Sequence, residues 1–300
     1  MRLAALFEGM DASVSGDAEI ADLVTDSRRV RPGALFIALR GTKVDGHGHI
    51  AAALAAGAVA VVVEDAAAAA DLAVPHVHCP GIRDGLWRVA ARFFGEPSRD
   101  LTVVGVTGTN GKTSTTYYLK GILEAAGRPT GLIGTIQYII GERTIKAVNT
   151  TPDALELQRL FAEMRDAGMK AVVMEVSSHA LVLKRTCGIH FDVAIFTNLT
   201  EDHLDFHKTM ENYVAAKLSF LDSLKESEKK KLRVCCNSAI QFSDVVMPKI
   251  AASGIPAWTF GVDPRADIAA LDDRATLDET SYQLRTPAGT VRVALSARGY

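Results

Sequence analysis

The run Val106–Ser114, Val-Thr-Gly-Thr-Asn-Gly-Lys-Thr-Ser, combines glycines, a lysine and hydroxyl residues at a spacing suited to phosphate chemistry. It follows the apolar segment 101–105 and precedes the helix-like segment 117–123. In a strand, a glycine-rich turn and a helix opening with Gly-Lys-Thr, main-chain N–H groups attract phosphate, the lysine reaches the β- and γ-phosphates, and the hydroxyl holds Mg²⁺. The run therefore predicts binding of ATP or a similar nucleotide. The residues expected to hold it are Gly108, Thr109, Asn110, Gly111, Lys112, Thr113 and Ser114.

The match to the usual phosphate-loop pattern is imperfect at one position. The pattern has a glycine six residues before the lysine, and Val106 occupies that position here, between Gly105 and Gly108. The alternative is a chance Gly-Lys-Thr in a surface turn. A strand-like and a helix-like segment on the correct sides favour the phosphate-binding loop.

A second polar cluster, Glu175–His179, follows the strand-like segment 171–174. Open α/β sheets bind ligands at the carboxyl ends of their strands. Glu175 would emerge at such an end, where a carboxylate can hold Mg²⁺ beside phosphates. A surface or helix-capping glutamate is the alternative, and the cluster alone leaves both open.

A third cluster, Thr197–His207, contains two histidines and three acids after the strand-like segment 193–196. So many ionisable groups at a strand end indicate metal, phosphate or proton chemistry. The alternative is a solvated helix start with Thr200 as its cap, where acids are favoured. Both interpretations can hold together.

Two further features have ordinary structural explanations. Asn149–Asp153 could bind a phosphate or sugar, but the sequence alone favours a helix cap with Pro152 in the first turn. Lys217 lies in an amphipathic segment, where a lysine is usually a solvated charge.

Composition limits the class of protein. A length of 300 residues predicts roughly two domains, and 48% hydrophobic residues are enough for sizeable cores. The net charge of -2 gives no reason to expect nucleic acid or a membrane surface as partner. We expect no signal peptide and no membrane span. The cysteines form neither a disulfide framework nor a zinc spacing, so a reduced, cytoplasmic protein is expected.

The elements that would position these residues fall into two regions. In the first, segments 35–39 and 58–63 read as buried strands and 50–56 as a helix. After a linker at 95–100, strands and helices alternate, which predicts a mostly parallel sheet covered by helices on both faces. The expected strands are 102–106, 130–133, 171–174, 193–197 and 232–236, the helices are 114–126, 154–167 and 213–224, and a hairpin joins 281–285 to 290–295.

The sequence thus predicts an α/β protein with a small amino-terminal α/β domain, residues 1–97, and a P-loop ATPase domain, residues 98–300. The second domain would carry a mostly parallel sheet and a smaller antiparallel region.

Taken together and in order, the motifs resemble those of the Mur ligase family, which builds the peptide of bacterial cell-wall precursors. The resemblance runs from about Asp26 to about Ala294 and includes an amino-terminal signature at 25–36. The motifs at 149–152, 174–181 and 197–205 resemble the tripeptide-forming branch in particular. That branch adds a diamino acid, meso-diaminopimelate or L-lysine, to UDP-N-acetylmuramoyl-L-alanyl-D-glutamate.

The resemblance implies an ATP-dependent ligase that works through an acyl phosphate with two Mg²⁺ ions. The implied catalytic residues are Lys112, Glu175, His203 and Lys217. Thr113 and Glu175 would serve one Mg²⁺, and His203 the other together with Lys217, which would carry a CO₂-derived carbamate.

It also implies two sets of substrate contacts. Thr25, Ser27, Thr42, Lys43 and Val44 would contact the uridine-diphosphate end of the precursor, and Asn149, Thr150, Thr151, Ser177 and Arg185 its muramoyl-dipeptide end. Leu183 stands where the branch usually has a glutamine, so one substrate hydrogen bond is expected to be missing or made elsewhere.

Two other functions stay open. Family members normally continue into a carboxy-terminal domain that selects the amino acid, so a binding fragment without ligase activity is one alternative. A folylpolyglutamate synthase-like ligase is a weaker one, against which the signature Asp26-Ser27-Arg28 argues.

Overall fold

The computed structural model describes residues 1–41, 44–70, 72–276 and 279–295. The chain forms two compact units, and each is described by itself. Unit 1 contains Met1–Pro97 and Asp153–Ala162, and unit 2 contains Ser98–Pro152 and Glu163–Tyr300. The sequence placed 153–162 with the second region, whereas the structure groups these residues with unit 1. The reason is packing, because Leu155 belongs to the core of unit 1 and Arg159 forms an ion pair with Asp22 at 2.9 Å.

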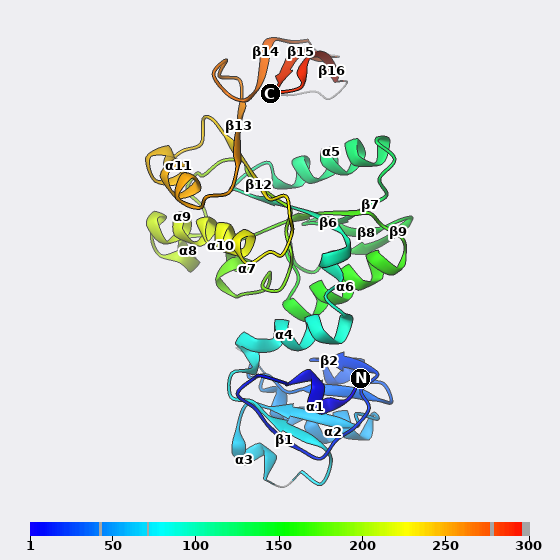
Figure 1. The fold of residues 1–300 in the computed structure, drawn as a ribbon. Coiled ribbons are helices and arrows are strands. Elements are labelled where there is room, and N and C mark those ends of the chain that lie inside the picture. Colours follow the sequence, from blue (N-terminus) through cyan, green and yellow to red (C-terminus); the bar gives the residue numbers. More distant parts are fainter. Residues whose placement is uncertain (42–43, 71, 277–278, 296–300) are drawn as a thin grey trace. The chain divides into compact units, whose positions relative to one another are not determined.

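Unit 1 is a small sheet with helices on both faces (Figure 1). The strand order is β1-β5-β4-β3-β2, with β1 antiparallel to β5 and the other pairs parallel. Leu35 and Ile37 belong to one hydrophobic cluster and Phe36 to another, so β3 is buried on both faces. The strands are β1 Ser13–Ser15, β2 Asp22–Val24, β3 Ala34–Ile37, β4 Ala60–Val63 and β5 His76–His78, and the helices are α1 Leu3–Leu6, α2 Ile50–Ala55, α3 Ala66–Ala69 and α4 Ile82–Phe94.

Unit 2 is built on a larger sheet in the order β16-β15-β14-β13-β12-β11-β6-β10-β7-β8-β9. The strands from β14 to β7 in that order are parallel, and antiparallel pairs flank them at both ends. The predicted fold class is therefore confirmed. The bounds are β6 Thr102–Thr107, β7 Thr130–Ile133, β8 Gln137–Ile140, β9 Arg143–Lys146, β10 Ala171–Glu175, β11 Val193–Phe196, β12 Arg233–Asn237, β13 Ala257–Gly261, β14 Ile268–Ala275, β15 Thr280–Thr286 and β16 Gly289–Leu295.

The helices of this unit cover both faces of the parallel strands, with α5 and α10 on opposite sides (Figure 1). Val104 and Val106 pack with Leu119 on the α5 side. Gly105 faces the other way, and a Cβ there would lie 2.4 Å from the ring of Phe220 in α10. The helices are α5 Lys112–Ala125, α6 Ala154–Asp166, α7 Ser178–Val182, α8 Leu204–His207, α9 Met210–Leu218, α10 Phe220–Lys225 and α11 Ser243–Ala252, with α6 shared between the units.

The predicted elements are confirmed with ends shifted by a few residues, except for one. The expected helix 213–224 is interrupted at Ser219, between α9 and α10. The Ser219 hydroxyl donates to the Ala216 carbonyl at 2.8 Å. Such local bonding competes with the helical pattern, and periodicity does not reveal it.

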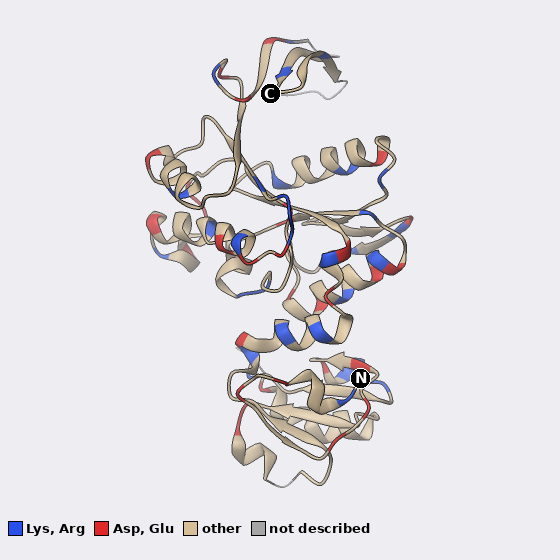
Figure 2. Ribbon diagram, in the orientation of Figure 1, with Lys and Arg blue, Asp and Glu red and all other residues tan. Residues whose placement is uncertain are grey.

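Acidic and basic residues occur in both units (Figure 2). Among the helices of the described residues, none is long and apolar enough to cross a membrane.

Candidate active site

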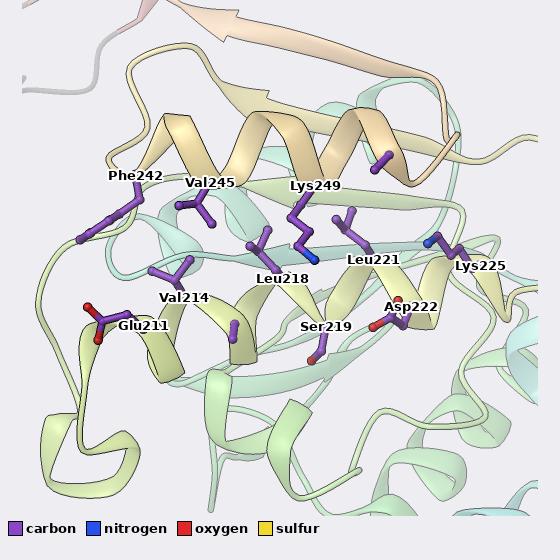
Figure 3. Close-up of a pocket in the computed structure, with 12 residues that line it drawn as sticks. Glu211, Val214, Leu218, Ser219, Leu221, Asp222, Lys225, Phe242, Val245 and Lys249 are labelled. Atoms are coloured by element: carbon purple, nitrogen blue, oxygen red, sulfur yellow. The ribbon is translucent and has the colours of Figure 1, made fainter.

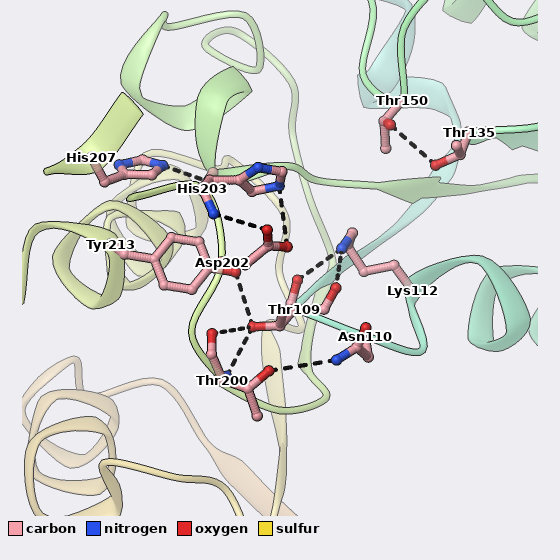
Figure 4. A network of polar contacts seen from close by, with 12 residues as sticks. Thr109, Asn110, Lys112, Thr135, Thr150, Thr200, Asp202, His203, His207 and Tyr213 are labelled. Carbon is pink, nitrogen blue, oxygen red and sulfur yellow. Dashed lines mark hydrogen bonds and ion pairs between the residues drawn. The ribbon is translucent and has the colours of Figure 1, made fainter. Parts of the chain in front are cut away.

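A polar cavity of about 250 Å³ lies in unit 2, where β6 and β10 end. It brings together most of the residues singled out in the ATPase region of the sequence. Figure 4 shows the polar contacts of several of them, among them Thr109, Lys112 and His203. Its lining consists of Thr109, Asn110, Gly111, Lys112, Thr113, Ser114, Thr135, Thr150, Glu175, Ser177, Ser178, His203 and Lys217.

A second cavity, of about 500 Å³, lies between α9–α10 and α11 (Figure 3). Its surface is mainly aliphatic, with Val214, Leu218, Leu221 and Val245 facing one another. Lys225 and Lys249 also line it, but two acids accompany them and none of the phosphate-loop residues does, so the smaller polar cavity is the candidate active site.

The loop between β6 and α5 has the backbone of a phosphate-binding turn. Gly108 and Gly111 have φ values of +142° and +82°, which favour glycine. A Cβ on Gly108 would lie 1.9 Å from the Thr197 hydroxyl oxygen, so a side chain cannot fit. The Thr197–Thr200 segment after β11 therefore lies directly against the loop.

The loop leaves a defined set of N–H groups for a ligand. The N–H of Thr109 donates to the Asn198 carbonyl at 2.9 Å, and that of Asn110 donates to Asn198 Oδ1 at 2.8 Å. The N–H groups of Gly111, Lys112 and Thr113 have no protein acceptor within the described part of the chain. Free N–H groups at a helix start attract anions, so this position fits a phosphate.

Two lysines converge on the first residue of the loop. The ammonium groups of Lys112 and Lys217 donate to the Gly108 carbonyl at 2.9 and 2.8 Å. Burial lowers the pKa of Lys112. Burial, and next the charge of Lys112, lower the pKa of Lys217 to about 7. The site therefore concentrates positive charge and favours an anion.

Glu175 is the last residue of β10 and is fully buried. Its Oε1 accepts from the Thr113 hydroxyl at 2.9 Å and from the Thr135 N–H at 2.8 Å. The interpretation as a surface glutamate is wrong, because the carboxylate lies inside the cavity beside the phosphate loop. Carboxylate and hydroxyl oxygens next to a phosphate position are ligands that suit Mg²⁺.

His203 lies in the loop before α8 with a φ of +53°. Its ring lies 4.8 Å from that of His179, and Nε2 is 3.4 Å from a carboxylate oxygen of Asp202. The helix starts at Leu204, so the expectation that Thr200 caps it is wrong. The Thr200 main chain instead bonds the Thr109 hydroxyl, which holds it in the loop.

Metal binding here would depend on more than His, Cys, Asp and Glu side chains. Over residues 1–41, 44–70, 72–276 and 279–295, no group of three or more His, Cys, Asp or Glu residues is arranged to hold a metal ion. Glu175 and His203 would thus need phosphate oxygens, hydroxyls or a modified Lys217 to complete a coordination shell.

The residues expected at the muramoyl-dipeptide end divide into two groups. Thr150 and Ser177 line the cavity. Thr151 is buried, its hydroxyl donates to the Glu175 carbonyl at 2.8 Å, and Arg185 donates to its carbonyl at 3.0 Å. Thr151 and Arg185 therefore hold the cavity wall in this structure.

Asn149 and Leu183 are not among the residues that line the cavity. The Asn149 carbonyl accepts from the Tyr138 hydroxyl at 2.7 Å. Leu183 is 51% exposed and does not line the cavity. The helix-cap interpretation of 149–153 is confirmed at Asp153, whose Oδ1 accepts from the Glu156 N–H at 2.9 Å. The expectation that Pro152 lies in the first turn is wrong, because α6 begins at Ala154.

The residues expected at the uridine-diphosphate end belong to unit 1. Thr25 and Ser27 flank Asp26, whose carboxylate accepts from the Arg28 N–H at 3.0 Å. The Arg28 guanidinium lowers the pKa of Asp26 to about 2. Val44 is exposed, and Thr42 and Lys43 lie outside the described residues.

Three residues of the site had no assigned role in the sequence. Thr135 donates twice to Glu175, Asn198 binds the phosphate loop, and Tyr213 contacts Thr109. Asn198 lies in the cluster already singled out, so its position at a strand end was the available signal. Thr135 and Tyr213 carry no such signal, because their contacts are with residues far away in the sequence.

The parallel sheet, the glycine turn and the lysine at the start of α5 define a P-loop-type nucleotide-binding protein. Comparison with known families makes this more specific. The Mur ligase middle domain matches residues 106–300, and a second profile, described as the Mur ligase family catalytic domain, matches residues 19–87. The chain belongs to the Mur ligase family.

Individual relatives agree with that assignment. The chain is 41% identical over 295 residues to UDP-N-acetylmuramoyl-L-alanyl-D-glutamate--2,6-diaminopimelate ligase of Geobacter metallireducens, covering 97% of this chain and 57% of that protein. It is 41% identical over 290 residues to UDP-N-acetylmuramyl-tripeptide synthetase of Roseiflexus sp., covering 94% and 57%. The chain thus spans about 57% of the length of these curated relatives.

A solved structure of a UDP-N-acetylmuramoyl-L-alanyl-D-glutamate--2,6-diaminopimelate ligase has a TM-score of 0.76 and 26% identity, covering 91% of this chain and 55% of that one. The resemblance found in the sequence motifs is therefore confirmed at the level of the family and its tripeptide-forming branch.

Proposed function

We propose that the chain carries the precursor-binding and ATP-binding parts of a ligase that adds a diamino acid to UDP-N-acetylmuramoyl-L-alanyl-D-glutamate. The observation that carries this proposal is one cavity that joins Lys112, the Thr113–Glu175 pair and Lys217. The identity of the relatives supports the tripeptide-forming reaction over a folylpolyglutamate synthase-like one.

The proposed reaction has two steps. The side-chain carboxylate of D-glutamate attacks the γ-phosphorus of ATP, and ADP leaves. The amine of the diamino acid then attacks the acyl carbon, loses a proton and displaces phosphate, which forms the peptide bond. The protein supplies no nucleophile, so its residues act by position and charge.

The residues of unit 2 suit these tasks. The free N–H groups at the start of α5 and Lys112 would hold the phosphates, and Lys112 would offset the charge of the transferring group. Thr113 and Glu175 would hold Mg²⁺, which when bound neutralises charge on the phosphate oxygens. Thr150 and Ser177 line the same cavity and would orient the acceptor carboxylate.

Lys217 has the properties that a carbamate requires. Its pKa of about 7 leaves a large share of neutral amine near neutral pH. The neutral nitrogen attacks the carbon of CO₂, a C–N bond forms as one C=O π bond opens, and the nitrogen loses a proton to solvent, which converts the neutral amine into an anionic oxygen ligand. Together with His203, which lines the same cavity, this group would bind a second Mg²⁺.

The test measures phosphate release with ATP, Mg²⁺ and the UDP-linked dipeptide, with meso-diaminopimelate and L-lysine added in separate reactions. We expect release that depends on the dipeptide and on one of the two amino acids. If the chain binds ATP and the UDP-linked dipeptide but forms no product, the binding-fragment alternative holds. If it binds neither nucleotide, the proposal is wrong.

A further inference from the structure

Tyr213 lies where three parts of the candidate site meet (Figure 4). It belongs to α9 and its side chain is fully buried. Its hydroxyl oxygen is 2.9 Å from Oγ1 of Thr109 in the phosphate loop. Its ring lies 4.7 Å from the Lys217 ammonium and 5.3 Å from the His207 ring. Tyr213 therefore touches the loop, the lysine and the histidine segment at once.

The donor in the Tyr213–Thr109 hydrogen bond follows from counting. A threonine hydroxyl has one proton and two lone pairs. Thr109 Oγ1 donates its proton to the Thr200 carbonyl at 3.0 Å and accepts from the Thr200 N–H at 3.0 Å. Only a lone pair is left, so the tyrosine donates. Burial raises the pKa of Tyr213, which keeps the phenol protonated for this bond.

The same count shows which hydrogen-bonding groups of Thr109 are left for a ligand. Its hydroxyl makes every bond it can make, and each partner is a protein group. Its N–H donates to the Asn198 carbonyl at 2.9 Å, and its own carbonyl accepts from Lys112 at 2.7 Å. Thr109 lines the cavity but has no donor left for a phosphate.

We infer that Tyr213 and Thr109 form a positioning pair, in which the tyrosine hydroxyl fixes the phosphate loop relative to Lys217 and the segment that carries His203. Neither side chain needs to touch the nucleotide. The inference rests on the proposed function, since it explains how the loop is held in shape for nucleotide binding at that site. It gives Thr109, which was expected among the residues that hold the nucleotide, the task of shaping the loop.

The test compares Tyr213→Phe, Thr109→Val and the double variant by calorimetric titration of the whole chain with ATP and Mg²⁺. Each single substitution removes hydroxyl bonds at nearly constant shape. We expect the Kd for ATP to rise by about threefold to tenfold in Tyr213→Phe, and at least as much in Thr109→Val. The double variant should bind no more weakly than Thr109→Val, because both changes remove the same bond.

Thr130→Val is the matched control. It removes another buried hydroxyl of unit 2, which donates to the Arg128 carbonyl at 2.7 Å at the start of β7. Thermal unfolding of every variant shows which ones lose stability, and titrations are run well below each Tm. A general structural effect would lower Tm without changing the Kd, as expected for Thr130→Val.

The outcomes separate the two claims. If the unaltered chain binds ATP and Tyr213→Phe binds it equally well, the positioning pair is wrong and the proposed function stands. If the unaltered chain does not bind ATP, the proposed function fails and the positioning role fails with it.

Discussion

Lys112 and Lys217 donate to the same main-chain oxygen, the carbonyl of Gly108, at 2.9 and 2.8 Å. Two ammonium groups, one buried and one partly buried, on one neutral acceptor are unfavourable unless a negative charge joins them or one amine loses its proton. Burial lowers the pKa of both groups, and the charge of Lys112 lowers the pKa of Lys217 further. A bound triphosphate would relieve the repulsion for Lys112, and a carbamate would do so at Lys217.

Replacing Lys112 tests its role toward phosphate. Lys112→Ala should weaken ATP binding by about tenfold to a hundredfold, the value of a charge-assisted hydrogen bond. Lys120→Ala on the same helix is the control, since Lys120 pairs with Glu124 and does not line the cavity. Equal ATP affinity of the two variants, measured by calorimetry, would contradict the assigned role.

Alanine at Gly108 and alanine at Gly121 should change the free energy of unfolding in opposite directions. Gly108→Ala adds a Cβ that would lie 1.9 Å from Thr197 Oγ1, and should lower the free energy of unfolding by about 2 kcal/mol or more. Gly121 lies in α5, and an added Cβ there would meet no heavy atom within 4 Å beyond its chain neighbours and its own helix backbone, so Gly121→Ala should raise the free energy of unfolding by up to about 1 kcal/mol. Urea unfolding measures both values, and a tolerated Gly108→Ala would show that the loop adopts another shape.

Glu175→Gln separates metal binding from nucleotide binding. The amide oxygen can accept from the Thr113 hydroxyl and the Thr135 N–H, and the amide NH2 can donate to the Thr135 hydroxyl, so the fold should persist. ATP affinity without Mg²⁺ should stay similar, while the enhancement by Mg²⁺ should fall by about tenfold. Glu226→Gln, at an exposed position, serves as the control. An undiminished effect of Mg²⁺ would rule out Glu175 as a metal ligand.

The lowered pKa of Lys217 predicts a pH dependence of stability. Below about pH 7 both the folded and the unfolded chain hold the Lys217 proton, whereas above it only the unfolded chain does, up to about 10.5. Unfolding then takes up a proton, so the folded form gains stability as pH rises through this interval, by at most about 1.4 kcal/mol per pH unit.

The measurement for Lys217 is urea unfolding of the unaltered chain and of Lys217→Met in CO₂-depleted buffer. The unfolding free energy of the unaltered chain minus that of Lys217→Met should increase from about pH 7 to about pH 10. Lys230→Met removes an exposed lysine and is the control for loss of a charge. A difference that is constant with pH would show that Lys217 stays protonated.

Local sequence was enough to predict the phosphate loop and the strands around it. The residue types from Gly108 to Ser114 are enough to predict the shape of the loop, because glycines, lysine and hydroxyls have fixed tasks in such a turn. Glu175 was placed correctly at a strand end, because the apolar segment 171–174 before it predicts a strand. The hairpin β8–β9 was not predicted, although the Gly141-Glu142 turn between two β-rich segments favours a hairpin.

The burial of Lys217 and the position of 153–162 could not be predicted from periodicity. A lysine on a helix is normally exposed, yet Lys217 is 1% exposed. Its ammonium donates to the carbonyl of Gly108, which is distant in sequence, and lies over the Tyr213 ring. The pattern of α6 shows an apolar face but not what that face packs against. Such facts depend on tertiary contacts, which one sequence does not reveal.

The central claim is that the cavity at the ends of β6 and β10 binds the phosphates of ATP together with Mg²⁺. The most direct test is calorimetric titration of the folded chain with ATP, in the presence and absence of Mg²⁺. The account predicts saturable binding that Mg²⁺ strengthens. Absence of binding at millimolar ATP, or binding that Mg²⁺ does not affect, would contradict it.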